Sequence, residues 1–289
     1  MHSSSRIEGQ LRAEALQAGG TFSVSVSDEI SLVCSPATGE GKTKDVAKGL
    51  FLCCNGEILA GESTGFGLPV LKTRCRTYFP SLVSASSIDS TRCEMVFQLD
   101  RVEILHVFGI RMPSLSAWIV EPLLHAYMKV PHHQQSLLKL GAALRSRFRA
   151  HGAMVPCTSQ GRCRVQYELR DGTLVVSVDA SQLTGRGQLI VLNEASGVSF
   201  DRLRIGDRIW EGKKIPGWKI VPFGAVLESP SVGYGFSIAA PDDTTASTWW
   251  LACGREVVPN LNWAGCALMT DQARFAYRVR FQRLKEASA

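Results

Sequence analysis

The sequence contains no long hydrophobic run. None of its stretches approaches the roughly 18 to 20 consecutive apolar residues that a membrane-spanning helix needs, and its first residues lack the apolar core of a signal peptide. Residues 1–20 are instead polar, rich in Ser, Gln and Ala, and we treat them as a loose leader outside the fold. We therefore expect no membrane partner and a cytoplasmic location.

The common signatures of catalysis and metal binding are also missing. The chain has no G-x-S-x-G or HExxH motif. Its nine cysteines include no CxxC pair, and most lie in apolar surroundings such as "LFLCCNG". Buried free thiols explain such cysteines better than disulfides or zinc ligands do. We therefore expect no cofactor and no metal, and the sequence alone does not identify the chain as an enzyme.

The chain does contain enough apolar material for a large core. Of its 289 residues, 45% are hydrophobic, and the mean hydropathy is +0.03. These values indicate a globular protein with one large or two modest domains. The net charge of +6 comes from arginines spread along the chain, so it permits an anionic partner without requiring one.

Two-residue alternation of apolar and polar side chains recurs along the chain and predicts β-strands. It occurs in residues 21–27, 93–105 and 274–284. The segment "RVQYELRDGTLVVSVD", residues 164–179, contains two alternating runs on either side of Asp171-Gly172, the strongest short-range signal for a hairpin. Strands separated by Gly, Pro and Asp turns at short intervals predict stacked antiparallel sheets.

One central region breaks this pattern. Apolar residues repeat at helical spacing in "QSLLKLGAALRSRFRAHG", so we predict helical material around residues 112–153. After the leader we expect a single large domain, residues 21–289, with halves at about 21–111 and 154–289 joined by this helical connection.

The predicted fold class is therefore mainly β, a large antiparallel β-sandwich or two joined sandwiches. In size, strand density and central interruption it resembles the supersandwich architecture of galactose mutarotase-like and polysaccharide-processing domains. This is a resemblance of fold, because no motif in the sequence carries the family.

The stretch "CSPATGEGKT", residues 34–43, raises the alternative of a phosphate-binding loop. Gly41, Lys42 and Thr43 match the end of a Walker A motif, but Pro36 occupies the position of its first glycine and has no N–H for a phosphate. Such a loop also requires strands that alternate with helices around a parallel sheet. We favour a polar turn, and nucleotide binding through a degenerate loop at 36–43 remains a third hypothesis.

Aromatic and polar residues supply the main functional candidates. Five of the six tryptophans lie between residues 210 and 263, and tryptophan on a sheet face offers a flat apolar surface for a sugar ring. Trp249 and Trp250 are adjacent, so on a regular strand only one of them can face inward. A glycine-rich segment with Gly61, Gly65 and Gly67 precedes further polar candidates. The predicted ligand-binding residues are Glu62, Arg74, Arg76, Trp218, Trp249, Trp250 and Trp263.

These observations favour a carbohydrate-directed protein that binds or modifies a sugar or glycan on an aromatic-lined sheet face. The competing hypothesis is a non-catalytic structural or protein-interaction module, which needs no catalytic signature. We do not expect a nucleic-acid partner, because the arginines of "RFAYRVRF" alternate with its aromatic residues and would lie on the opposite face. No feature of the sequence specifies a substrate, a reaction or an oligomeric state.

Overall fold

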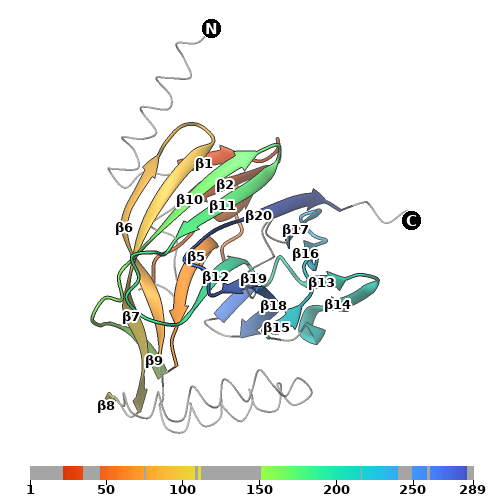
Figure 1. The fold of residues 1–289 in the computed structure, drawn as a ribbon. Helices are drawn as coiled ribbons and strands as arrows, with labels where there is room; N and C mark the ends of the chain where they lie inside the picture. The colour runs from red at the N-terminus through yellow and green to blue at the C-terminus, as the bar shows by residue number, and fades with distance from the viewer. Residues whose placement is uncertain are drawn as a thin grey trace.

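A computed structural model describes residues 22–34, 46–74, 76–107, 110–111, 151–215, 217–239, 249–258 and 261–284. These residues form β-strands, turns and one short 3-10 helix (Figure 1). In this part of the chain no helix is long and apolar enough to cross a membrane.

The first nine strands run from residue 22 to residue 156. They are β1 (Phe22–Ser25), β2 (Ile30–Cys34), β3 (Phe51–Cys54), β4 (Glu57–Ile58), β5 (Phe66–Lys72), β6 (Thr77–Ser87), β7 (Arg92–Val107), β8 (Ile110–Arg111) and β9 (His151–Pro156).

The second half contributes the remaining elements. They are β10 (Arg162–Arg170), β11 (Thr173–Asp179), β12 (Gln188–Ala195), β13 (Arg202–Ile205), β14 (Arg208–Glu211), the 3-10 helix η4 (Gly212–Lys214), β15 (Lys219–Val221), β16 (Val226–Ser229), β17 (Tyr234–Ala239), β18 (Trp249–Val258), β19 (Leu261–Thr270) and β20 (Arg274–Arg283).

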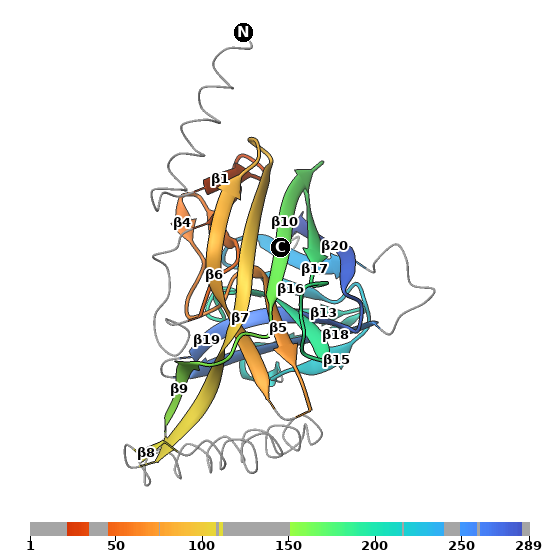
Figure 2. The ribbon, with the colours of Figure 1, turned by 60° about the vertical axis from the view of Figure 1, so that its left-hand side comes forward.

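The strands form two antiparallel sheets. The small sheet has the order β1-β2-β3-β4, and the large one has 16 strands in the order β14-β13-β16-β17-β20-β11-β10-β7-β6-β5-β12-β19-β18-β15, with β8 and β9 paired to β7. Strands β7, β6 and β5 from the first half therefore lie between strands of the second half. Figure 2 shows β6, β7 and β10 side by side, with β18 and β19 running across their lower end. The predicted class, mainly β with large antiparallel sheets, is confirmed.

The large sheet curls so that its two ends approach each other. β14 ends at Glu211 and β15 begins at Lys219, yet they are the first and last strands of the order. The chain between them can span at most roughly 28 Å, whereas a flat sheet with this many strands would be roughly 60 Å wide. Across the two ends, Lys219 Nζ lies 5.5 Å from the centre of the Trp210 ring.

The hairpin predicted at Asp171-Gly172 is confirmed. Arg170 pairs with Thr173, and the two turn residues have φ angles of 48° and 70°, as a two-residue turn with both φ values positive requires. The other alternating runs form β1, β7 and β20. On β20 the side chains of Tyr277 and Val279 are buried while the arginines alternate with them, also as predicted.

The helical prediction is not supported by the described residues. Residues 112–150, which carry most of it, lie outside them, and residues 151–153 begin strand β9 rather than ending a helix. The leader, residues 1–20, and the lysine-bearing turn at 36–43 also lie outside the described residues. Strands β2 and β3, on either side of that turn, pair directly and antiparallel. A phosphate-binding loop instead joins a strand of a parallel sheet to a helix.

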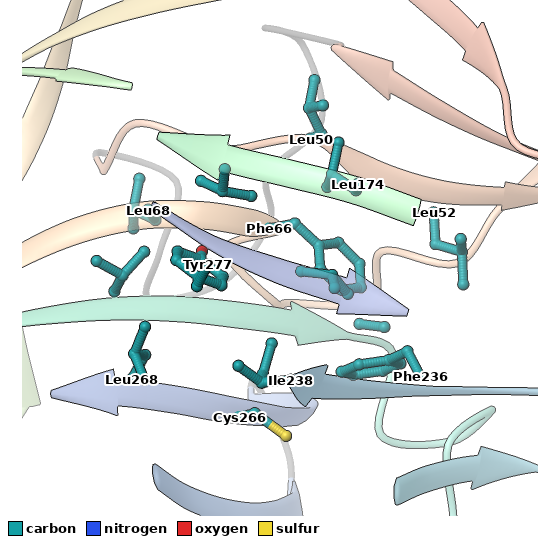
Figure 3. Packing of buried hydrophobic residues seen from close by; sticks show 14 of the residues in the cluster. Leu50, Leu52, Phe66, Leu68, Leu174, Phe236, Ile238, Cys266, Leu268 and Tyr277 are labelled. Atoms are coloured by element: carbon teal, nitrogen blue, oxygen red, sulfur yellow. The ribbon is translucent and has the colours of Figure 1, made fainter. Parts of the chain in front are cut away.

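The core lies between the facing parts of the curled sheet, and the small sheet adds to it. Figure 3 shows side chains from both sheets meeting there, with Leu174 of β11 and Tyr277 of β20 opposite Leu268 of β19. The alternation of β11 and β20 directs one side chain in two toward this region. Burying that apolar surface is the main source of stability.

A buried hydrogen-bond network lies inside this core. Tyr277 Oη donates to Asn193 Oδ1 at 2.8 Å, and the Gly67 N–H donates to the same oxygen at 3.2 Å. Tyr167 Oη donates to the carbonyls of Phe66 and Gly67 at 3.1 and 3.3 Å. Asn193 is fully buried, so losing these partners would leave polar atoms unsatisfied away from water. The network fixes β5 and β12 against β10 and β20.

The cysteines of the described residues are free thiols, and all except the half-buried Cys157 are buried. Burial raises the pKa of Cys34 to about 11 and that of Cys163 to about 12. Cys253 and Cys266 are opposite each other on β18 and β19. The prediction of buried free thiols is therefore confirmed for these residues.

Gly67 is the position where this network leaves least room. Its φ is +80°, and an added Cβ would lie 2.5 Å from a ring carbon of Tyr167. Gly172 also has a positive φ, +70°, but an added Cβ there meets nothing within 4 Å. We predict that Gly172→Ala lowers the free energy of unfolding by about 1 to 2 kcal/mol, the cost of a left-handed backbone, and that Gly67→Ala costs about 1 to 3 kcal/mol more because of the clash. Urea unfolding measures both, and equal losses would contradict this description of Gly67.

Candidate functional site

Trp249 and Trp250 lie on opposite faces of strand β18. The Trp249 ring packs edge-on against Phe275, with ring centres 5.2 Å apart. The Trp250 side chain is on the other face and is 39% exposed. The expectation that one of this pair faces outward is therefore confirmed.

Three of the predicted tryptophans share the outward face of the β18–β19 ribbon. The pairing of β18 with β19 runs without a register shift, with Trp250 opposite Met269 and Glu256 opposite Trp263. Side chains alternate along each strand, so Trp250 and Trp263 project to the same side. Trp218 stacks on Trp263, with ring centres 4.4 Å apart and planes 18° from parallel.

The middle of this outward face is made of small residues. Gly254 and Gly265 pair there. An added Cβ at Gly254 would lie 2.4 Å from the Gly217 carbonyl oxygen, so the chain entering β15 rests directly on the ribbon. Ile220 of β15 pairs with Ala252 and is 55% exposed. We call Trp218, Ile220, Trp250, Trp263 and Met269 the aromatic face.

The predicted polar residues do not all join this surface. The Glu62 N–H donates to the carbonyl of Asn262, the residue before Trp263, at 3.0 Å. Glu62 therefore lies beside the Trp263 end of the aromatic face. Arg74 and Arg76 are exposed in the turn after β5, at the opposite end of that strand from the glycine-rich segment. The structure brings Glu62 to the tryptophans and leaves the two arginines apart from it.

The glycine-rich segment is fastened to β12 by a buried polar cluster. Glu194 Oε2 accepts hydrogen bonds from the N–H and the Oγ1 of Thr64, at 2.9 and 2.7 Å. Lys48 Nζ donates to the Ser63 carbonyl at 3.4 Å. Lys48 and Glu194 are both at most 8% exposed. Sequence reasoning missed both residues, although a carboxylate near the end of the largely apolar run "QLIVLNEA" was a signal for Glu194.

Burial shifts both charged groups of this cluster toward neutrality. It lowers the pKa of Lys48 to about 8, against the attraction of the Glu194 charge. It raises the pKa of the Glu194 carboxyl, against the hydrogen bonds from Thr64 and the charge of Lys48. Glu194 Oε2 and Lys48 Nζ both contact the glycine-rich segment, at Thr64 and Ser63, so the cluster holds that segment against β12.

A separate polar pocket lies on the outward face of the middle of the large sheet. One cross-strand row forms its floor, with Ser84 of β6 beside Val96 of β7, then Arg164 of β10, Asp179 of β11 and Arg274 of β20. The cavity has a volume of about 360 Å³. Its floor joins residues that are far apart in sequence, which is why sequence patterns did not reveal it.

An ion-pair network organises one side of the pocket lining, at Asp179, Ser181 and Arg274. Asp179 Oδ1 accepts hydrogen bonds from the N–H and the Oγ of Ser181, at 2.9 and 2.5 Å. Arg274 Nε donates to Asp179 Oδ2 at 3.1 Å, and Arg274 Nη2 donates to Ser181 Oγ at 3.1 Å. The hydrogen bonds from Ser181, and then Arg274, lower the pKa of the Asp179 carboxyl, so it is ionised at neutral pH.

Two further arginines project into the same space. Arg162 and Arg164 alternate with buried residues on β10 and line the pocket. Arg164 Nε lies 3.6 Å from a carboxylate oxygen of Glu94, and Glu94 is not one of the residues that line the pocket. The Arg162 guanidinium group has no hydrogen-bond or ion-pair partner among the described residues, although the Arg162 backbone pairs with Gln98 of β7. We call this site, defined by Arg162, Arg164, Asp179, Ser181 and Arg274, the arginine pocket.

Comparisons with known proteins give little further guidance. No family model matches the chain, and no curated protein matches it. Among solved structures, the chain is similar to a protein in the glycosyl hydrolase family 38 from Enterococcus faecalis, with a TM-score of 0.37 and 10% sequence identity. The similarity covers 93% of this chain and 32% of that chain. At this TM-score the likeness carries no argument about fold or function.

The buried polar cluster predicts a specific pH dependence. The pKa of Lys48 is about 8 in the folded chain and near 10.5 in the unfolded chain. Below pH 8 Lys48 is charged in both states, so burying its charge lowers the free energy of unfolding by the full amount. Between pH 8 and 10.5 the folded chain loses this proton first, and the loss of unfolding free energy disappears as the pH rises. Relative to Lys48→Met, wild type should therefore gain up to about 1.4 kcal/mol of unfolding free energy per pH unit in this window. Urea unfolding of both proteins from pH 7 to 10.5 measures the difference. A difference that stays constant with pH would contradict a lysine buried with a lowered pKa.

Proposed function

We propose that the protein binds a sugar or glycan on the aromatic face. The observation that carries the proposal is the exposed Trp250 ring, which lies on a sheet surface beside the exposed side chain of Ile220. An indole ring offers a flat apolar surface to the C–H face of a sugar and keeps a polar N–H for a hydroxyl. On this proposal the fold is a large sandwich of the supersandwich type.

The exposed part of the aromatic face, at Trp250 and Ile220, has the extent of a single sugar ring, because the chain at Gly217 lies on Gly254 between Trp250 and Trp263. Trp250 and Trp263 are separated by the small residues of β18 and β19, and six residues of strand correspond to roughly 20 Å. Trp263 is 7% exposed and stacks on the half-buried Trp218 at the far end of the face, so the ligand contact that we propose is at Trp250. Glu256, on the same face opposite Trp263, and Glu62, beside Asn262, place two carboxylates near the Trp263 end of the face.

The proposal concerns binding, and it assigns no catalytic residue. Trp249 belongs to the core side of β18, so we omit it from the ligand contacts. We also omit Arg74 and Arg76, because they lie at the other end of β5 from Glu62. Nucleotide binding at residues 36–43 is not proposed, since the flanking strands are antiparallel neighbours.

One observation favours a second candidate, a protein-interaction surface. Ile209 of β14 and Ile220 of β15 are 52% and 55% exposed, on the two terminal strands of the sheet order. Exposed apolar side chains grouped on the surface mark a contact area for another protein chain. Light scattering distinguishes this candidate, because it predicts a stable oligomer in the absence of any glycan.

We predict that Trp250→Ala abolishes or greatly weakens glycan binding. Loss of a stacking ring should lower affinity by about tenfold or more, equivalent to about 1.4 kcal/mol. The measurement is a glycan array with wild type and variant, followed by calorimetry on any sugar that binds. Ile88→Ala is the matched control, because Ile88 is also exposed, at 49%, but lies in the turn between β6 and β7.

Two results would contradict the proposal. One is a wild-type protein that binds no glycan on the array. The other is glycan binding that Trp250→Ala leaves at wild-type strength, since the ligand would then contact another surface.

A further inference from the structure

We propose that the arginine pocket is a second binding site, and that it takes an acidic sugar, a small polyhydroxylated molecule with one carboxylate or sulfate group. The pocket lies on the β6, β7, β10, β11 and β20 part of the sheet, whereas the aromatic face lies on β15, β18 and β19. The inference is therefore independent of the proposed glycan site.

The charge of the lining selects an anion. Three guanidinium groups, from Arg162, Arg164 and Arg274, surround one carboxylate, that of Asp179. Arg274 is already committed to Asp179 and Ser181. The other two arginines are left to face the cavity, and of these Arg164 has only the 3.6 Å approach to Glu94 outside it. The lining thus holds more positive charge than its own carboxylate neutralises.

The spacing of these two arginines suits a planar or tetrahedral oxyanion. Arg162 and Arg164 are two residues apart on one strand, which places their Cα atoms roughly 7 Å apart with side chains on the same face. A guanidinium group presents several N–H donors in a rigid fork that matches carboxylate and sulfate oxygens. Two such forks side by side can bind both oxygens of one carboxylate.

The rest of the lining suits the hydroxyls and C–H groups of a sugar. Ser84 and Gln182 offer hydroxyl and amide groups that can donate or accept hydrogen bonds. Val83, which is 44% exposed, and Val96 add apolar surface. The volume of about 360 Å³ is in the range of small-molecule pockets, which is about 300 to 1,000 Å³.

Asp179 restricts the choice of anion. It is ionised at neutral pH and held in place by Ser181 and Arg274. A fixed carboxylate in the wall accepts hydrogen bonds from ligand hydroxyls but repels additional negative charge. This combination favours a singly charged, hydroxyl-rich ligand over a polyphosphate.

Calorimetry with glucuronate, glucose and inorganic sulfate tests the assignment on the full chain. We expect glucuronate to bind and glucose not to bind, since only the former carries a carboxylate. Removing one charged hydrogen-bond donor should weaken glucuronate binding by about tenfold or more, so Arg162→Ala and Arg164→Ala should each show this loss. Both side chains lie on the exposed face, and circular dichroism of the variants verifies that they fold.

The matched control is Arg280→Ala, which removes the same charge from an exposed position on β20 outside the pocket and should leave binding unchanged. A comparable loss in Arg280→Ala would overturn the site, because it would reflect general charge. Glucuronate binding that both pocket variants retain would also overturn it, as would no binding of glucuronate to wild type. Equal affinity for sulfate and glucuronate would overturn the assignment to a sugar and leave an unspecific anion site.

Discussion

The pairing of β7 with β10, and of β5 with β12, is the constraint on which the rest of this structure depends. These two contacts insert strands of the first half of the chain into the middle of a sheet built by the second half. They join residues that are far apart in sequence, so forming them loses the conformational entropy of the long chain segments between the strands. The free energy of burying a large apolar interface has to offset this loss. The buried network of Asn193, Gly67, Tyr167 and Tyr277 lies where these strands meet.

The two faces of the curled sheet have different roles, because one face forms the core and the other carries the candidate binding sites. The inward side chains of each strand form the core, and the outward ones are free to form surfaces of different chemistry. On β18 and β19 the outward side chains form the aromatic face, whose small central residues let the chain entering β15 lie against the ribbon. On β10, β11 and β20 the outward side chains form the arginine pocket. Both candidate sites therefore follow from strand register rather than from loops.

Features with a short sequence range could be predicted, and features set by distant pairing could not. The hairpin at Asp171-Gly172 and the two faces of β20 are encoded within a few residues, and both are as expected. The opposite orientations of Trp249 and Trp250 also follow from alternation alone. The row from Ser84 to Arg274 needs four strand pairings to be known, so no local pattern predicts it. The helical expectation was wrong at residues 151–153, which pair with β7 as strand β9, because pairing to an existing strand overrides local propensity.

Both halves of the chain share one sheet in this register. Ser86 of β6 and Ala276 of β20 are exposed and end one cross-strand row through Glu94, Gln166 and Ser177. Four strand spacings place their backbones roughly 19 Å apart. The direct measurement is the electron spin–spin distance between labels on Ser86→Cys and Ala276→Cys, after replacement of Cys157 and any other accessible thiol. A single narrow distribution at about 20 to 30 Å, including the label arms, is the predicted result. A broad distribution, or a distance beyond about 40 Å, would mean that the halves form separate sheets.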